Sequence, residues 1–266
     1  MNTMELFSLK GKVALVTGAS RMYGRHAAEG LADAGARVYI TGTHPDTLAE
    51  VAQEMSEECH AEVFPMVFRQ EDPDSIRSVV SDLIAREGRI DILVSSCRVI
   101  PGAPSGWYQE EAGLDWATKA NAAGWLYLTE LVGEQMIRQK SGSIINFASM
   151  MGLIGVEKHN YDGNPGMDAG AHSHDYAVNK SGIISWTRHA ASYYGQYGIR
   201  VNSVCPGGIL SERTPHPFVE NYSAHTQLGR MANNDDIKGP ILFLASDASA
   251  YLTGLSIPVD GGYTCL

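Results

Sequence analysis

The chain has no long apolar run and fewer basic than acidic residues. No stretch approaches the roughly 18 consecutive apolar residues of a membrane-spanning helix, so we expect no membrane span. The opening MNTMELFSLKGK lacks a basic region followed by an apolar core, so it is not typical of a secretion signal. The formal net charge of −10 argues against a nucleic-acid-binding surface and against adhesion to an anionic membrane.

Cysteine is also scarce. The four cysteines, Cys59, Cys97, Cys205 and Cys265, are scattered and show no metal-ligand spacing. Reduced thiols are typical of the cytoplasm, where disulfides rarely persist. We therefore expect free thiols and a cytoplasmic protein.

What the sequence does contain is a regular alternation of strand-like and helix-like stretches. Alternating elements predict parallel strands joined by right-handed crossovers, and near-continuous apolar strands predict a sheet covered on both faces. A length of 266 residues suits one such α/β domain. We predict a single doubly wound domain over residues 1–266, with about seven parallel strands and helices on both faces. The strand-like runs are KVALVTG, ARVYITG, AEVFPMVF, RIDILVS, GSIINFAS, IRVNSV and LSIPVDGG.

Two stretches interrupt this alternation. Residues 156–174 are rich in Gly, Asp, Asn and His, and residues 207–231 show no clear periodicity. Both follow strands, where open α/β sheets bind ligands, and long loops in a compact domain are usually functional or disordered. We predict that residues 156–174 form an inserted loop near the active site and that residues 207–231 form a substrate-binding lid.

A glycine-rich turn follows the first predicted strand. In VALVTGASRMYGRHAAEGLADAG, Gly18 and Gly24 flank the turn, and we expect the helix to begin near Gly24. Backbone N–H groups at such a helix start bind a pyrophosphate, assisted by the helix dipole. The alternative interpretation is a tight connection between strand and helix.

A tyrosine and a lysine lie four positions apart in DYAVNK. Tyr176 and Lys180 share one face of a predicted helix, Ser149 ends the strand SIINFAS, and Asn121 lies in the preceding long helix. An ammonium about 4 Å from a phenolate stabilises it by roughly 4 kcal/mol at an effective dielectric near 20. Tyr176 is then a candidate general acid/base near pH 7, with Ser149 hydrogen-bonded to the reacting oxygen. The alternative is a solvated pair on a helix surface.

Taken together, these motifs resemble the classical short-chain dehydrogenase/reductase family over almost the whole chain. The resemblance implies a Rossmann-type fold, a small-molecule substrate, hydride transfer by a nicotinamide cofactor, and a homotetramer. It implies a catalytic group of Asn121, Ser149, Tyr176 and Lys180, in which the lysine also binds the nicotinamide ribose and the asparagine holds a water in a proton relay. The cofactor-binding residues it implies are Gly18, Ser20, Arg21, Tyr23, Gly24, Thr43, Ser96, Tyr176, Lys180, Pro206, Gly207 and Ile209.

Three departures from the family pattern fall on the cofactor side. Met22 stands at the middle glycine of T-G-x-x-x-G-x-G, Arg69 stands where an aspartate usually follows the third strand, and Ser95–Arg98 (SSCR) replaces N-N-A-G. The middle glycine allows close approach of the backbone to the phosphates. With Met22 there, we expect the cofactor to sit differently or the loop to retreat.

The end of the second strand bears on the choice between NAD and NADP. An acidic residue there holds the ribose diol of NAD, but this chain has Thr43. Arg21, and also Arg69, are candidates to pair with the 2′-phosphate of NADP. The sequence therefore favours NADP, with NAD as the alternative.

The insertion and the substrate leave several hypotheses open. Ser149 and Tyr176 are 27 positions apart, about fourteen more than is usual in the family. The extra residues are expected to wall the substrate pocket; His172 and His174 lie among them without a third ligand, so we predict no metal. A sugar, a hydroxy acid and a ketone remain candidate substrates. The competing interpretations are a cofactor-independent lyase, isomerase or dehalogenase-like enzyme, and a non-catalytic relative.

Overall fold

The computed structural model describes residues 2–99, 111–164 and 174–266. Its centre is a sheet of seven parallel strands in the order β3-β2-β1-β4-β5-β6-β7. This confirms the predicted parallel sheet. The strands are β1 (Val13–Thr17), β2 (Arg37–Gly42), β3 (Val63–Val67), β4 (Ile92–Ser95), β5 (Gly142–Phe147), β6 (Ile199–Pro206) and β7 (Ser256–Val259).

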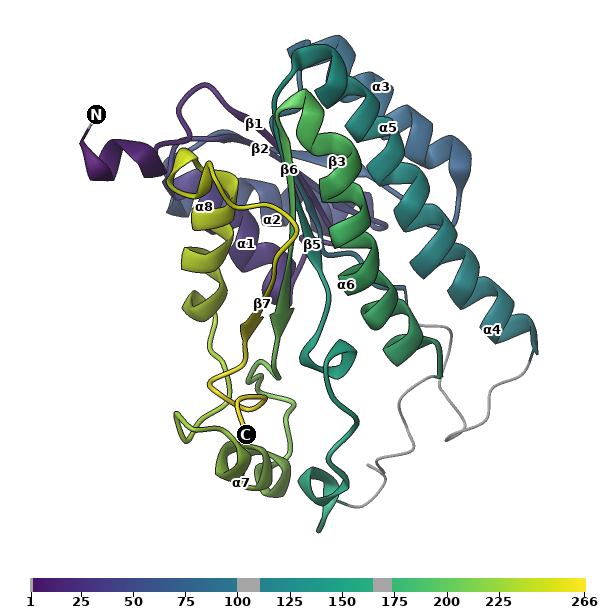
Figure 1. Ribbon diagram of the computed structural model, residues 1–266, viewed down its shortest axis with the longest axis vertical. Helices are drawn as coiled ribbons and strands as arrows, with labels where there is room; N and C mark the ends of the chain where they lie inside the picture. Colours follow the sequence, from purple (N-terminus) through teal and green to yellow (C-terminus); the bar gives the residue numbers. More distant parts are fainter. Residues whose placement is uncertain (1, 100–110, 165–173) are drawn as a thin grey trace.

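Helices cover both faces of the sheet (Figure 1). Successive residues of a strand point to opposite faces, so β1 contributes Ala14 and Val16 to one apolar core and Val13 and Leu15 to the other. The doubly wound arrangement is therefore confirmed. One face is covered by α1 (Met22–Asp33), α2 (Pro45–Glu58) and α8 (Lys238–Ala245), and the other by α3 (Pro73–Glu87), α5 (Trp125–Gln139) and α6 (His174–Tyr194).

The strand order reverses between β1 and β4, because the chain winds outward from β1 in one direction and from β4 in the other. In an open α/β sheet this switch point creates a crevice at the carboxyl ends of the strands. The loops after β1, β4, β5 and β6 all lie at this end, which is the lower end in Figure 1, where α7 (His216–His225) also lies.

One long helix on the sheet is interrupted by a wider turn. Between α4 (Glu111–Thr118) and α5, residues Lys119–Gly124 form a π-helix, labelled η2, which contains Asn121. The helix passes very close to the end of β3, where a side chain at Gly124 would overlap the carbonyl oxygen of Gln70. The Gln70 amide also donates to the Ala120 carbonyl at 3.0 Å. Turns of this kind occur frequently at functional sites.

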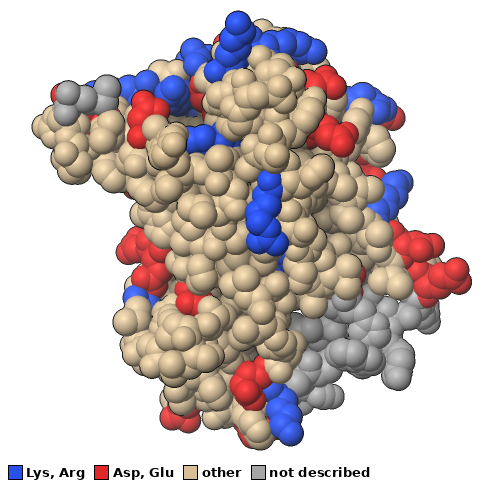
Figure 2. All heavy atoms as spheres, in the orientation of Figure 1, with Lys and Arg blue, Asp and Glu red and all other residues tan. Residues whose placement is uncertain are grey.

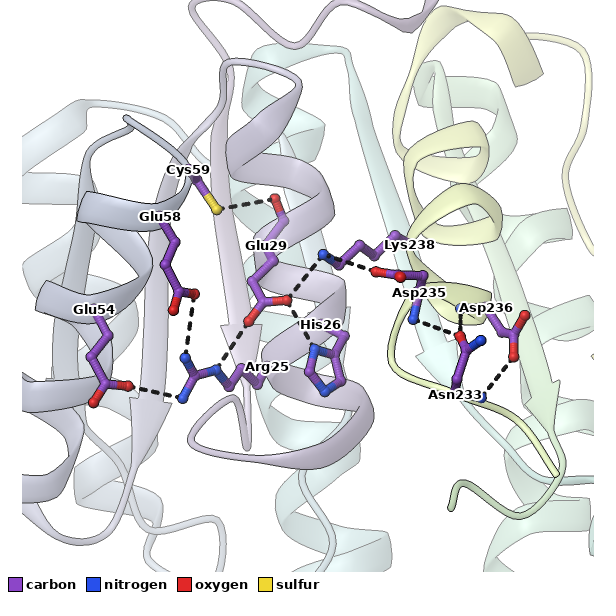
Figure 3. A network of polar contacts seen from close by, with 10 residues as sticks. All are labelled: Arg25, His26, Glu29, Glu54, Glu58, Cys59, Asn233, Asp235, Asp236 and Lys238. Atoms are coloured by element: carbon purple, nitrogen blue, oxygen red, sulfur yellow. Dashed lines mark hydrogen bonds and ion pairs between the residues drawn. The ribbon is translucent and has the colours of Figure 1, made fainter. Parts of the chain in front are cut away.

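A buried carboxylate fastens α1 to α8 (Figure 3). Glu29 is 7% exposed and is contacted by Arg25 at 3.0 Å, His26 at 2.9 Å and Lys238 at 3.2 Å. Burial alone would raise the pKa of Glu29, but hydrogen bonds from His26 and Arg25 outweigh it and lower the pKa to about 2. The carboxylate is therefore ionised and paired at neutral pH.

The two irregular stretches contain short helices that periodicity alone did not predict. Residues 207–231 include α7, and residues 156–174 begin with a 3₁₀ turn, η4 (Lys158–Tyr161); residues 165–173, with His172, lie outside the described residues. None of the helices described is both long enough and apolar enough to cross a bilayer. The other short turns are η1 (Thr3–Phe7), η3 (Met150–Gly152), η6 (Gly195–Tyr197), η7 (Asp235–Ile237) and η8 (Asp247–Ser249).

Candidate active site

A cleft of about 1140 Å³ opens at the carboxyl ends of the strands. Its walls come from the turns after β1, β2, β4, β5 and β6 and from the start of α6. The cleft brings together every residue predicted to be catalytic or cofactor-binding except Asn121. Those lining it are Gly18, Ser20, Arg21, Tyr23, Gly24, Thr43, Ser96, Ser149, Tyr176, Lys180, Pro206, Gly207 and Ile209.

The glycine turn is pressed against the end of β4. Gly18 has a φ of 65°, and a Cβ there would lie 2.7 Å from the Cα of Cys97. A Cβ at Gly24 would overlap the carbonyl oxygen of Gly18. Both positions therefore require glycine for packing, and Gly18 also for its backbone conformation. The start of α1 is consequently held directly at the cleft, where its N–H groups are available to an anion.

Met22 adopts the left-handed backbone conformation that glycine adopts without cost. Its φ is 54°, it is 42% exposed, and it lines the cleft. The first helix begins at Met22, two residues before the expected start near Gly24. A left-handed residue other than glycine costs roughly 1–2 kcal/mol. The substitution therefore adds strain and side-chain bulk beside the groove.

Hydrogen bonds from β1 fix the segment Ser95–Arg98. The Thr17 hydroxyl oxygen accepts from the N–H groups of Ser96 and Cys97, both at 3.1 Å, and the Ser96 hydroxyl donates to the Thr17 carbonyl at 2.7 Å. Although the segment lacks the family's N-N-A-G, it is rigidly attached to β1. It places Cys97 and Arg98 in the wall of the cleft.

Two tyrosines connect the end of β6 to its surroundings. The Tyr23 hydroxyl donates to the Gly207 carbonyl at 3.0 Å, and the Gly208 N–H donates to the Tyr222 hydroxyl at 2.6 Å. Burial raises the pKa of Tyr23 far above its usual value and that of Tyr222 to about 12, so both hydroxyls stay protonated. These tyrosines are suited to holding the Pro206–Gly207 segment in place, and not to proton transfer.

Two cations lie against the ring of Tyr176. The Arg98 guanidinium carbon is 4.2 Å and the Lys180 ammonium nitrogen 5.8 Å from the ring centroid. Lys180 is 8% exposed and donates to the Phe147 carbonyl at 2.6 Å. Burial, reinforced by the charge of Arg98, lowers the pKa of Lys180 to about 8. Positive charge this close to the ring favours negative charge on its oxygen during proton transfer.

Ser149 is the N-cap of the short turn η3 and lies two residues after the end of β5. It is 5% exposed, and its hydroxyl oxygen accepts from the Met151 N–H at 3.1 Å. This bond leaves the hydroxyl hydrogen available to donate toward the cleft. Ser149, Tyr176 and Lys180 therefore line one cleft and approach it from two elements, the end of β5 and α6.

Asn121 lies behind this group. Its side-chain oxygen accepts from the Val99 N–H at 2.9 Å, and its amide donates to the Val99 carbonyl at 2.7 Å and to Asp175 at 3.4 Å. Asn121 lines a small buried cavity of about 10 Å³ that also reaches Tyr176 and Lys180. The structure therefore places it as a support of the loop after β4, separated from the cleft.

Several lining residues were missed by sequence reasoning, and one expected residue lies elsewhere. Arg69 is not among the described residues that line the cleft, and its guanidinium is 4.0 Å from Glu71. Phe218 and Tyr222, one helical turn apart on α7, were the available signal for an apolar wall on residues 207–231. Further lining residues include Met150, Met151, Asn160, Tyr161, Glu212, Arg213, Phe218 and Tyr222.

Metal-binding side chains do not gather in the described part of the chain. Within residues 2–99, 111–164 and 174–266, no three His, Cys, Asp or Glu side chains are grouped as metal ligands would be. The four cysteines are free thiols.

Comparisons with known proteins agree over nearly the full length. Residues 18–264 match a family model described as enoyl-(acyl carrier protein) reductase. The chain is 34% identical over 259 residues to the 3-oxoacyl-[acyl-carrier-protein] reductase FabG of Thermotoga maritima, covering 96% of this chain and 98% of that protein. It is 33% identical over 267 residues to an L-rhamnose 1-dehydrogenase (NAD(P)(+)) of a Sphingomonas species, covering 96% of each.

Solved structures show the same likeness. A short-chain type dehydrogenase/reductase from Mycobacterium marinum superimposes with a TM-score of 0.85 at 30% identity, covering both chains completely. A gluconate 5-dehydrogenase from Burkholderia cenocepacia, in complex with NADP and tartrate, gives a TM-score of 0.85 at 27% identity, also over both complete chains.

Proposed function

Because the chain belongs to the classical short-chain dehydrogenase/reductase family and is therefore an oxidoreductase, we propose that it transfers hydride between a nicotinamide cofactor and a carbonyl/alcohol substrate. Tyr176 acts as the general acid/base. The observation that supports this most directly is the meeting of Ser149, Tyr176 and Lys180 in one cleft, with two cations against the tyrosine ring.

The cleft suits a dinucleotide in size and charge. Its volume of about 1140 Å³ exceeds that of an ordinary small-molecule pocket. Arg21, Arg98, Lys180 and Arg213 line it against a single carboxylate, Glu212, among the described residues, although the chain as a whole is acidic. The glycine turn and the start of α1 would hold the phosphates. When bound, the nicotinamide supplies the hydride acceptor or donor.

The proton is handled by this chain's own residues. In alcohol oxidation, Tyr176 accepts the substrate's hydroxyl proton, while the Ser149 hydroxyl donates a hydrogen bond to the same oxygen and orients it. The positive charges of Lys180 and Arg98 near the Tyr176 ring would favour negative charge on its oxygen during the transfer. In carbonyl reduction, the same groups work in reverse, and Tyr176 donates the proton.

We prefer NADP to NAD as the cofactor. Thr43 lines the cleft at the end of β2, where NAD-binding proteins carry an acidic residue, and Arg21 lines it nearby in sequence. The relatives support this weighting without deciding it, since one solved neighbour holds NADP and one curated relative is named for both cofactors.

Among the three candidate substrate classes, we prefer a hydroxy acid. Arg213 lines the cleft in addition to the proposed cofactor-binding Arg21, and a carboxylate would pair with its guanidinium. A solved neighbour is named as a gluconate dehydrogenase, which supports the same class. Neutral sugars and simple ketones would gain less from these charges.

Titration of the purified protein with NADPH and NADH tests the proposal. We expect micromolar binding by calorimetry, tighter for NADPH. If neither nucleotide binds the folded protein, the cofactor-independent lyase, isomerase or dehalogenase-like alternative gains, because Ser149 and Tyr176 would then act on substrate alone. Failure of every substrate despite tight nucleotide binding would favour a non-catalytic relative.

Replacing the general acid/base tests the assignment of Tyr176. We expect Tyr176→Phe to lower kcat by at least about a thousandfold, as loss of a proton-transfer group combined with disturbed charge would. The nucleotide dissociation constant should change by less than about threefold. Phe218→Leu, on α7, is the matched control and should retain turnover within about tenfold. Full activity of Tyr176→Phe contradicts the assignment.

We also propose a homotetramer, with the exposed face around β7 and α6 as one contact. β7 lies at the edge of the sheet. Leu255, beside it, is 41% exposed, and Tyr193 on α6 is 53% exposed. Figure 2 shows few charged side chains around these elements. An apolar face next to an open strand edge is a typical subunit contact. Sedimentation should give about four times the chain mass of 28.7 kDa.

The two irregular stretches are proposed to enclose the substrate. Asn160 and Tyr161 from residues 156–174 line the cleft together with Phe218 and Tyr222 from residues 207–231. They are joined, since Asn221 donates to the carbonyl of Asp162 at 2.9 Å and the rings of Tyr161 and Phe218 are 5.3 Å apart. We propose that residues 207–231 act as the lid and residues 156–174 as its partner wall.

A further inference from the structure

Arg98 stands where the family's N-N-A-G segment ends in a glycine, which has no side chain. The carbon of its guanidinium lies 4.2 Å from the centroid of the Tyr176 ring. Arg98 lines both the main cleft and the small cavity behind it, and it is exposed. This chain therefore carries, beside the proposed general acid/base, a cation that the family pattern does not contain.

Asn121 holds the residue next to Arg98. Its side-chain oxygen accepts from the Val99 N–H at 2.9 Å, and its amide donates to the Val99 carbonyl at 2.7 Å. Both backbone polar groups of Val99 are thus paired with one side chain, as a neighbouring strand would pair them. Asn121 is 9% exposed and lies on the π-helix η2. The loop after β4 is therefore fastened to a buried helix.

The other side of Arg98 is fastened to the sheet. The Cys97 N–H donates to the Thr17 hydroxyl oxygen at 3.1 Å, at the end of β1. Arg98 is the single residue between this attachment and the one at Val99. Its backbone cannot move away from the cleft without breaking one of the two.

The guanidinium adds a permanent positive charge at Tyr176. A cation near the face of an aromatic ring is attracted to it, and the attraction grows when the ring carries negative charge. Burial, together with the charge of Arg98, lowers the pKa of Lys180 to about 8, whereas a guanidinium keeps its proton throughout the working range. Further titratable groups around this ring and Lys180 include Tyr23 on α1, Cys97 after β4, Tyr161 on η4, Asp175 on α6 and Cys205 on β6.

We propose that Arg98 is a positioning residue for the proposed reaction, holding the Tyr176 ring and stabilising negative charge on its oxygen, and that Asn121 acts through Arg98 by holding the loop. The inference rests on the proposed oxidoreductase function. It gives Asn121 a role different from the water binding that the family resemblance implies. Alcohol oxidation requires the ionised form of a general base, so the added cation extends oxidation toward lower pH.

Arg98→Met tests the proposal because it removes the charge and keeps most of the side-chain length. The assay oxidises whichever of gluconate, mannitol or isopropanol the wild-type enzyme accepts. We expect kcat at pH 7 to fall about threefold to tenfold, and the acid limb of the pH profile to move up by about half to one unit. At high pH, where the phenol ionises unaided, kcat should approach the wild-type value. KM and nucleotide affinity should stay within about twofold.

Arg98→Lys restores a charge and should recover most of the displacement of the acid limb. Because Arg98 is exposed, added salt should reduce the difference between Arg98→Met and wild type. Arg86→Met, exposed on α3, is the matched control and should leave the profile unchanged. A merely structural role would lower kcat equally at every pH, without rescue by lysine, and overturns the proposal. A raised KM with an unmoved acid limb would assign Arg98 to substrate binding and overturns it too.

A double-mutant cycle tests the role of Asn121. We expect Asn121→Ala to move the acid limb in the wild-type background and to add less than about a twofold loss of kcat in Arg98→Met. An equal loss in both backgrounds would show that Asn121 acts independently of Arg98, and this part of the proposal would be wrong. Asn121→Ser is the milder variant, used if the melting curve of Asn121→Ala shows no folded state.

The ionisation of Tyr176 provides a readout that needs no substrate. The ultraviolet difference between proteins with and without Tyr176→Phe, followed over pH, isolates this one phenol. Its midpoint should lie at higher pH in the Arg98→Met background than with Arg98 in place, and an unchanged midpoint contradicts the inference. If the wild-type enzyme binds no nucleotide and oxidises none of the three alcohols, the proposed function fails, while this titration still decides the role of Arg98.

Discussion

Two buried charged side chains in this molecule have opposite electrostatic environments. Glu29, between α1 and α8, and Lys180, on α6, are almost equally buried, at 7% and 8% exposure. Glu29 is surrounded by Arg25, His26 and Lys238 (Figure 3), whereas Lys180 is bonded to a backbone carbonyl and has Arg98 nearby. The Glu29 charge is stabilised by its neighbours, whereas the Lys180 charge is destabilised by burial and by Arg98.

The two pKa values are both lowered, with opposite consequences for stability. The pKa of Glu29 falls from 4.5 to about 2, so it contributes stability above pH 4.5 that is lost as pH falls toward 2. The pKa of Lys180 falls from 10.5 to about 8, so burying its ammonium costs stability below pH 8, and this cost declines between pH 8 and 10.5. Each shift corresponds to roughly 3 kcal/mol. A stabilising network therefore holds α1 to α8, while the candidate active site retains a costly charge.

The largest effect should come from removing the costly charge. We expect Lys180→Met to reduce kcat at least about a thousandfold and to raise the free energy of unfolding by about 2 kcal/mol at pH 7. The gain is the shift of roughly 3 kcal/mol less about 1 kcal/mol for the lost hydrogen bond to Phe147. Urea unfolding at several pH values measures it, and the advantage over wild type should shrink between pH 8 and 10.5.

Lys10→Met, on the exposed surface, is the matched control and should change neither quantity appreciably. A Lys180→Met protein that is less stable than wild type at pH 7 would show that the buried ammonium does not lower the stability of the fold. The proposed contrast with Glu29 would then be wrong.

The opposite result is expected on the other side of the comparison. Glu29→Gln should lower the free energy of unfolding by about 2–3 kcal/mol at pH 7, because three cationic or ring groups lose a buried anion. Turnover should stay within about twofold, since the network lies outside the cleft lining. The difference from wild type should shrink as pH falls from 4.5 toward 2. Glu130→Gln, exposed on α5, should leave the free energy of unfolding unchanged. An equal loss of stability in both variants would show that the buried network around Glu29 adds no stability.

The smallest effect concerns Met22, a second place where the cleft carries strain. Met22→Gly should relieve the left-handed backbone and raise the free energy of unfolding by up to about 1 kcal/mol, partly offset by the larger unfolded-state entropy of glycine. Met22→Ala keeps the strained φ and removes only the side chain. If nucleotide affinity rises equally in both variants, side-chain bulk limits binding; if only glycine helps, the backbone does.

The sequence predicted the parts that depend on local pattern. Alternation within β1 is enough to assign Ala14 and Leu15 to opposite faces, and four-residue spacing is enough to place Tyr176 and Lys180 on one side of α6. The cation against the tyrosine ring was not predictable, because Arg98 is 78 residues before Tyr176 and meets it only through the fold.

Other features escaped because no local signal encodes them. The π-helix at Lys119–Gly124 accompanies a contact between Gly124 and Gln70, which lie on different elements. Asp175 is adjacent to Tyr176 in sequence, yet its burial and its contact with Asn121 at 3.4 Å arise only from the packed interior. The helix α7 is short, with one proline just before it and another as its second residue, so periodicity was too weak to predict it.

The wide turn at Lys119–Gly124 makes the site depend on how many residues a helix contains, and not only on which ones. Removing a single residue there would allow an unbroken α-helix, in which everything upstream is rotated by about 100° relative to α5. Asn121 would then lose its contacts with Val99, although the sequence would still encode every functional residue. A one-codon deletion at this point should thus be more damaging than many substitutions, although a comparison of residue identities would register it only as a gap.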